Sequence, residues 1–142
     1  MMRTAASQVG LSVLAISIDQ SRDIPVRMQE FKGKTDFIYV GTSGPIQPAL
    51  PTVTSEALKM KIPVFNVEEQ AVLDGLALAS FGVDYKAVGR NAGKLVARLL
   101  NGADIKNLAP IYPKLEDHKC FINKKLAERF GITIPKNAMV VE

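Results

Sequence analysis

The sequence predicts an α/β fold of three layers, in which a parallel sheet carries helices on both faces. Short apolar runs alternate with amphipathic stretches along the chain, an order typical of repeated strand–helix units. The clearest unit lies at residues 72–102, where an apolar run, a turn and a long amphipathic stretch follow one another. The other elements are assigned around this unit.

Residues 76–81 are small and apolar, which predicts a strand buried on both faces, and Gly82 is expected to end it. Asp84 suits the N-cap of a helix that closes at Asn101-Gly102. Apolar residues recur along that helix at spacings of three and four, which predicts a stripe that lies on the sheet. The stripe consists of Tyr85, Val88, Ala92, Leu95, Val96 and Leu99.

The stretch before this unit reads as a helix over residues 1–9 stopped by Gly10, followed by alternating strands and short helices. Strands are expected at residues 11–17, 35–40 and 62–65, and helices at residues 24–31, 49–60 and 68–74. After the unit, residues 103–119 are predicted to form a connector and residues 120–142 a strand–helix tail. In that tail a strand covers residues 120–122, Asn123 caps a helix closed by Gly131, and residues 139–141 are apolar.

Bulk properties exclude several function classes. The chain has 142 residues, enough for one domain, and a net charge of +4 without the aromatic interleaving or module of a nucleic-acid binder. Cys120 is the sole cysteine and cannot form an intramolecular disulfide. It lies two residues from His118, the sole histidine, and a buried inert thiol is favoured over a catalytic pair. We expect no enzyme activity, no cofactor, no metal site and no nucleic-acid partner.

The sequence also lacks the motifs of nucleotide-binding and phospho-receiver domains. No phosphate-binding glycine loop follows a strand, and no aspartate closes the strand at residues 35–40 as a phospho-receiver domain would need. Four basic residues at four-residue spacing, Lys86, Arg90, Lys94 and Arg98, are best explained as a solvated helix face, with an anionic partner surface as the alternative.

Candidate ligand-binding residues follow the predicted strands, because the carboxyl ends of parallel strands share one edge of a sheet. Thr42, Ser43 and Gln47 offer neutral hydrogen-bonding groups after the strand at residues 35–40, although such residues also suit a turn. Glu68 and Glu69 follow the next strand, and only one of two adjacent carboxylates would face a ligand; Glu68 is the residue chosen. Asp84 and Tyr85 follow the third, where capping would by itself explain Asp84.

The run A-S-F-G-V-D-Y-x-x-x-G-R-x-A-G-x-L-V-A-R-L-L-N-G resembles the C-terminal lobe of ABC-transporter substrate-binding proteins of the tryptophan/tyrosine-binding type, within the type I periplasmic binding proteins. T-D-F-I-Y-V, K-I-P-V-F and F-I-N-K-K-L-A-E-R-F-G-I-T-I-P fit the same pattern in the same order. The resemblance implies a flavodoxin-like lobe that binds a small polar molecule such as an amino acid without chemistry, for delivery to an ABC permease. It also implies a periplasmic or extracytoplasmic location. The family often has an Asp-Asn-type pair where this chain has Thr42-Ser43.

Length is the main departure from the resemblance, because only one lobe of a two-lobed protein is represented. Met1-Met2-Arg3 is not followed by an apolar core segment, so no signal peptide is expected. We expect a homodimer, joined through residues 120–141 or through the first helix, since such segments exchange readily between identical chains. A ligand-sensing domain of a regulator remains the alternative function, and a fused DNA-binding or signalling domain would identify it.

Overall fold

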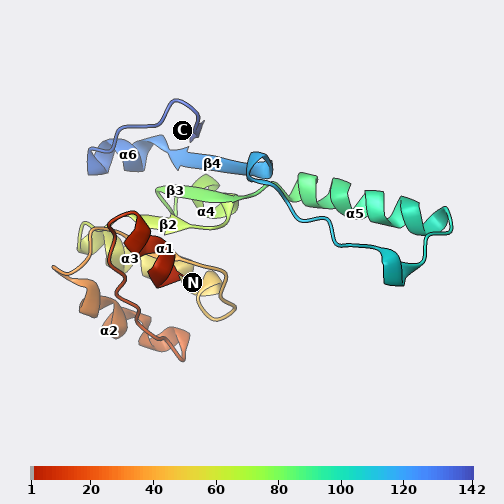
Figure 1. Cartoon of the computed structure of the whole chain (residues 1–142). Coiled ribbons are helices and arrows are strands. Elements are labelled where there is room, and N and C mark those ends of the chain that lie inside the picture. The colour runs from red at the N-terminus through yellow and green to blue at the C-terminus, as the bar shows by residue number, and fades with distance from the viewer. Residues whose placement is uncertain (1) are drawn as a thin grey trace. The chain divides into compact units, whose positions relative to one another are not determined.

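The computed structural model describes residues 2–142, within two compact units, Met1–Phe65 and Asn66–Glu142. Its strands are β1 (Ile38–Val40), β2 (Val64–Asn66), β3 (Ala79–Val83), β4 (His118–Asn123) and β5 (Met139–Val141). They form one mostly parallel sheet in the order β1-β2-β3-β4-β5 (Figure 1). The predicted α/β class is confirmed.

The first unit holds helices α1 (Met2–Gln8), α2 (Ile24–Met28) and α3 (Leu50–Lys59). Its core forms where α2 packs against α3, and Ile24, Met28 and Val53 are almost completely buried there. Pro51 lies in the first turn of α3, where its missing N–H leaves no helical hydrogen bond unmade. Gly10 has a positive φ, which agrees with its predicted role as the stop after the first helix.

The prediction of a strand at residues 11–17 was wrong. These residues form no strand, and Leu11 and Leu14 are 48% and 45% exposed. A strand requires a neighbour that pairs with its backbone along its length. Here single side chains donate to the backbone instead, such as the guanidinium of Arg3 to the carbonyl oxygen of Val13 at 2.9 Å. β1 is also shorter than expected, and β2 is shifted toward Asn66.

The second unit holds helices α4 (Glu69–Leu73), α5 (Tyr85–Leu100) and α6 (Lys124–Phe130). Its buried apolar side chains come from α4, from the run into β3, from β4 and from α6; they include Val72, Ala77, Leu78, Ile122 and Ala127. Asn123 caps α6 as predicted, because its Oδ1 accepts a hydrogen bond from the backbone N–H of Leu126 at 3.0 Å. Gly131 then ends the helix in the left-handed conformation.

β4 is antiparallel to β3, which departs from the all-parallel prediction. The chain leaves β3 at Val83, and after α5 and residues 103–117 it enters β4 directly beside Val83, which pairs with His118. A backbone hydrogen bond from Asp84 N to the carbonyl oxygen of Asp117, at 2.8 Å, fixes this return. β5 then runs parallel to β4. β4 begins at His118, so it takes in the last two residues of the predicted connector and starts two residues before the predicted strand.

Gly82 was expected to end its strand, but it lies inside β3 and pairs with Lys119. A Cβ added at this residue would lie 2.1 Å from the carbonyl oxygen of Val67. A glycine is therefore required here because another backbone segment approaches closely. The strand continues through it.

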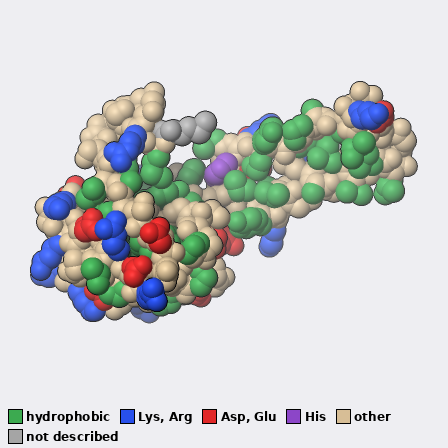
Figure 2. Space-filling model, turned by 90° about the horizontal axis from the view of Figure 1, so that it is seen from below, with side chains coloured by type: hydrophobic (Ala, Val, Ile, Leu, Met, Phe, Trp, Pro, Cys, Tyr) green, Lys and Arg blue, Asp and Glu red, His purple; other side chains and the backbone are tan. Residues whose placement is uncertain are grey.

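The apolar stripe of α5 was expected to lie on the sheet, and this expectation was wrong. Ala87 is the one buried residue of α5, while Val96 and Leu100 are 53% and 83% exposed. Figure 2 shows hydrophobic side chains gathered on the part of the second unit that contains α5 and the following segment. The start and end of the helix were nevertheless predicted correctly: Asp84 caps it, and Asn101-Gly102 closes it.

Candidate functional site

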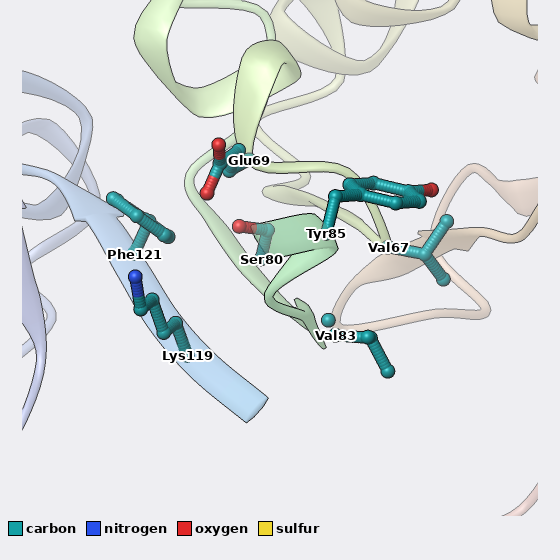
Figure 3. Close-up of a pocket in the computed structure, with 8 residues that line it drawn as sticks. Val67, Glu69, Ser80, Val83, Tyr85, Lys119 and Phe121 are labelled. Atoms are coloured by element: carbon teal, nitrogen blue, oxygen red, sulfur yellow. The ribbon is translucent and has the colours of Figure 1, made fainter. Parts of the chain in front are cut away.

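A small hollow lies in the second unit at the carboxyl ends of β2 and β3. Its walls come from the residues just after β2, from β3 and the start of α5, and from β4. They are Val67, Glu69, Ser80, Gly82, Val83, Tyr85, Lys119 and Phe121 (Figure 3). β4 contributes because it is antiparallel, which brings its first residues beside the end of β3. The edge where the sequence predicted ligand contacts is therefore hollowed.

Ser80 forms the floor of this hollow. It alternates with Gly82 on one face of β3, and Phe121 and Lys119 lie opposite them on β4. Its side chain is 3% exposed, and its hydroxyl oxygen has no hydrogen-bond partner among the described residues. Buried hydroxyls are nearly always paired, so an unpaired one facing a hollow marks a place where another polar group can bind.

Charged side chains stand around Ser80. In Figure 3 the carboxylate of Glu69 and the hydroxyl of Ser80 project into the same space. Lys119 is engaged elsewhere, because its Nζ lies 3.0 Å from Oδ2 of Asp84. That hydrogen bond, together with the one from the Lys86 backbone N–H, holds the pKa of Asp84 below its usual value. Lys119 is thus paired with Asp84, and Glu69 is the acidic side chain among the residues that line the hollow.

Three of the predicted site residues belong to this unit. Tyr85 lines the hollow and is 71% exposed, whereas Asp84 caps α5 and fixes Lys119. Glu68 precedes α4, and its backbone N–H donates to Oδ1 of Asn66 at 2.9 Å. Of the two adjacent glutamates, Glu69 lines the hollow. Ligand contact by Glu68, Asp84 and Tyr85 stays a prediction.

The other three predicted residues, Thr42, Ser43 and Gln47, belong to the first unit. Thr42 and Ser43 line a mainly apolar cavity of about 170 Å³, whose walls also include Ile16, Met28 and Val53. The Nε2 of Gln47 donates to the carbonyl oxygen of Gly41 at 3.2 Å, and the Ser43 carbonyl oxygen accepts from the Gln47 backbone N–H at 3.0 Å. These bonds stabilise the turn, which agrees with the structural alternative; their role in binding stays a prediction.

Sequence reasoning missed Ser80 and Lys119. A signal for Ser80 existed, because it is the one polar residue in the apolar run at residues 76–81. A hydroxyl in a strand buried on both faces needs a partner, and this requirement makes such a residue a site candidate. Lys119 could not be found in this way, because its position depends on the antiparallel pairing of β4 with β3.

His118 and Cys120 lie on the opposite face of β4 from Lys119. The imidazole of His118 stacks on Phe81 with ring centroids 5.4 Å apart, and its Nδ1 is 2.8 Å from the carbonyl oxygen of Lys114. Cys120 is half-buried. The histidine is thus held by packing and a backbone contact, whereas the thiol is less buried than predicted.

Within residues 2–142, no group of histidine, cysteine or acidic side chains has the arrangement of a metal site. None of the helices in that range is both long and apolar enough to cross a membrane.

Comparisons with known proteins agree with the fold. The chain is 31% identical over 119 residues to the tyrosine-binding protein of Clostridioides difficile, a match that covers 84% of this chain and 34% of that protein. It is also similar to two solved structures, each of which it covers to 48% with 99% of its own length. The chain therefore spans half or less of the length of these relatives.

The first structure is an ABC domain from Streptococcus pneumonia in complex with L-Trp, with 28% identity and a TM-score of 0.81. The second is a ligand-free, open substrate binding protein with adhesive properties from Clostridium difficile, with 27% identity and a TM-score of 0.76. The family model for ABC transporter substrate binding proteins matches residues 1–142, the whole chain. This family consists of binding proteins, which act without catalysing a reaction, and it works outside the cytoplasm. On the evidence of that full-length match, the chain belongs to the ABC transporter substrate binding protein family.

Proposed function

We propose that this chain provides part of the ligand site of an ABC transporter substrate-binding protein and binds a small polar molecule such as an amino acid. The observation that carries the proposal is the hollow at the carboxyl ends of β2 and β3, with the buried, unpartnered hydroxyl of Ser80 as its floor. Relatives that bind tyrosine and tryptophan support an aromatic amino acid as the ligand.

Binding by this chain alone is expected to be weak. The hollow has a volume of only about 20 Å³, so it can enclose a polar head group and leaves the rest of an amino acid exposed. Small-molecule sites of high affinity bury most of the ligand surface. We expect dissociation constants for tyrosine and tryptophan no tighter than about the millimolar range, equivalent to roughly 4 kcal/mol.

Titration followed by amide chemical shifts tests the proposal. Tyrosine and tryptophan should shift the amide signals of residues 66–70 and 80–85, and glucose should leave them unchanged. If neither amino acid shifts those signals at millimolar concentration, this chain does not bind aromatic amino acids at the proposed edge. A micromolar dissociation constant would contradict the expected weakness and indicate a more enclosed site.

We also propose two protein partners. The permease of an ABC transporter is the partner expected from the family, and an extracytoplasmic location follows from that role. The second partner is another copy of this chain, joined through residues 120–141 or through α1. Light scattering at micromolar concentration tests the dimer: twice the mass of 15.4 kDa is expected, and a monomeric mass that persists as the concentration rises would reject it.

A further inference from the structure

The size of the hollow restricts which chemical group can enter it. A volume of about 20 Å³ holds one group of the size of a water molecule. An ammonium group, with one heavy atom, is of that size, whereas a carboxylate has three heavy atoms. The walls add a second restriction, because the backbones at Gly82 and Val67 approach so closely that a Cβ on Gly82 would lie 2.1 Å from the Val67 carbonyl oxygen.

The charges around the hollow decide the sign of the group. Lys119 is paired with Asp84 at 3.0 Å, and the two charges offset each other. Among residues 2–142, the carboxylate of Glu69 forms no ion pair, and it projects toward the hydroxyl of Ser80 (Figure 3). One negative charge thus remains uncompensated at the hollow, which favours a cation and disfavours an anion.

The hydrogen-bonding capacity agrees with this sign. A carboxylate only accepts hydrogen bonds, and a serine hydroxyl can accept them as well. Ser80 is only 3% exposed, and its hydroxyl oxygen has no hydrogen-bond partner among the described residues. A group that enters must therefore supply N–H or O–H donors, and an ammonium group supplies three.

We propose that this hollow is the subsite for the primary ammonium group of the ligand, with Glu69 and Ser80 as the accepting residues. This proposal rests on the proposed function, since it names the part of the amino acid that this chain recognises. Tyr85 stands at the exposed side of the hollow, where the remainder of the ligand would extend. The alternative occupant is a single ordered water molecule that satisfies Ser80 and has no role in binding.

The test uses three probes of one aromatic skeleton with the full chain: tyrosine, tyramine, which lacks the carboxylate, and 3-(4-hydroxyphenyl)propionate, which lacks the amine. Tyrosine and tyramine should shift the amide signals of Ser80, Gly82 and Lys119, and the propionate should not. If the propionate shifts them as strongly as tyramine does, or if none of the probes shifts them, the ammonium subsite is rejected.

Variants identify the residues responsible. Glu69→Gln keeps the size of the side chain and removes its charge, so tyramine affinity should fall about ten-fold, since hydrogen bonds to a charged acceptor are the stronger ones. Ser80→Ala should also weaken tyramine binding, while the fold is retained because the lost hydroxyl has no partner. Glu128→Gln in α6 and Ser55→Ala in α3 make the same chemical changes at exposed residues and should bind as the unchanged chain does.

The outcomes separate this proposal from the proposed function. Tyrosine binding that shifts other signals of this edge, and that Glu69→Gln leaves unchanged, would reject the ammonium subsite and keep the amino-acid function. Tyramine binding that depends on Glu69, without any response to tyrosine or tryptophan, would support the subsite and reject the amino-acid function. A water-only site predicts equal shifts, or none, for all three probes in the unchanged chain and in Ser80→Ala.

Discussion

α3 and α5 are both amphipathic helices, but the structure holds them in different ways. α3 is buried along its side, through Leu50, Val53, Thr54 and Ala57. α5 is longer, yet it is held mainly at its first turn, where Ala87 is buried, Asp84 caps the helix and Asp84 pairs with Lys119. The comparison teaches that an apolar stripe in a sequence predicts a helix with a face to cover, and that the covering partner need not be in the same chain segment.

The largest difference should appear between leucines of the two helices. Leu50→Ala in α3 removes a side chain that is 4% exposed and should lower the free energy of unfolding by about 2–5 kcal/mol. Leu100→Ala in α5 removes one that is 83% exposed, and its effect should stay within about 0.5 kcal/mol. Chemical denaturation measures both. An equally large loss for Leu100→Ala would show that the face of α5 is covered in solution.

Gly82 in β3 and Gly89 in α5 differ in the space around their Cα atoms. Gly82→Ala places a Cβ against the carbonyl oxygen of Val67, and one of the two backbone segments must move, at a cost of about 1–3 kcal/mol. Gly89→Ala in α5 meets no atom within 4 Å and should stabilise the helix by up to about 1 kcal/mol. Thermal unfolding of both variants should therefore give shifts of opposite sign. A neutral Gly82→Ala would mean that the approach of Val67 is looser than the structure has it.

Features that a few adjacent residues determine were predicted correctly from the sequence, and features that depend on distant segments were not. Local chemistry identified the caps Asp84 and Asn123 and the stops Gly10 and Gly131, because each depends on a few adjacent residues. Features that depend on backbone segments far apart in the sequence were predicted wrongly or not predicted. Residues 11–17 form no strand although their composition suits one, and Gly82 lies inside a strand because of Val67. In the hollow, Tyr85 was predicted from strand order, whereas Lys119 required the antiparallel register of β4.

The cap of α6 gives a smaller effect. Asn123→Ala removes the acceptor for the Leu126 N–H, and the free energy of unfolding should fall by about 1–2 kcal/mol. Its side chain is buried and its Nδ2 also approaches the carbonyl oxygen of Val72, so this helix start is tied to the core. Asn123→Ser keeps an accepting oxygen and should recover part of the loss. Denaturant titrations that find Asn123→Ala and Asn123→Ser equally destabilised would remove capping as the cause.

The start of α5 should show the smallest effect, and it depends on pH. The hydrogen bond from Lys119 and the bond from the Lys86 backbone N–H lower the pKa of Asp84 in the folded state. The stabilisation that results is complete above the pKa of the unfolded chain, about 3.9, and is lost as the pH falls through the folded-state pKa.

Asp84→Asn keeps a capping oxygen and removes the charge, so it should be slightly less stable than the unchanged chain at pH 7, and this deficit should shrink below about pH 4. Because Lys119 is partly exposed, added salt should also reduce the deficit. Asp104→Asn is the matched control, since Asp104 accepts from the Lys106 N–H at 3.0 Å in the same way but forms no ion pair with a lysine among the described residues. Denaturation at pH 7 and pH 3 measures each difference. If the Asp84→Asn deficit is the same at both values, the ion pair with Lys119 does not hold α5 to β4, and the cap and the buried Ala87 remain as its attachment.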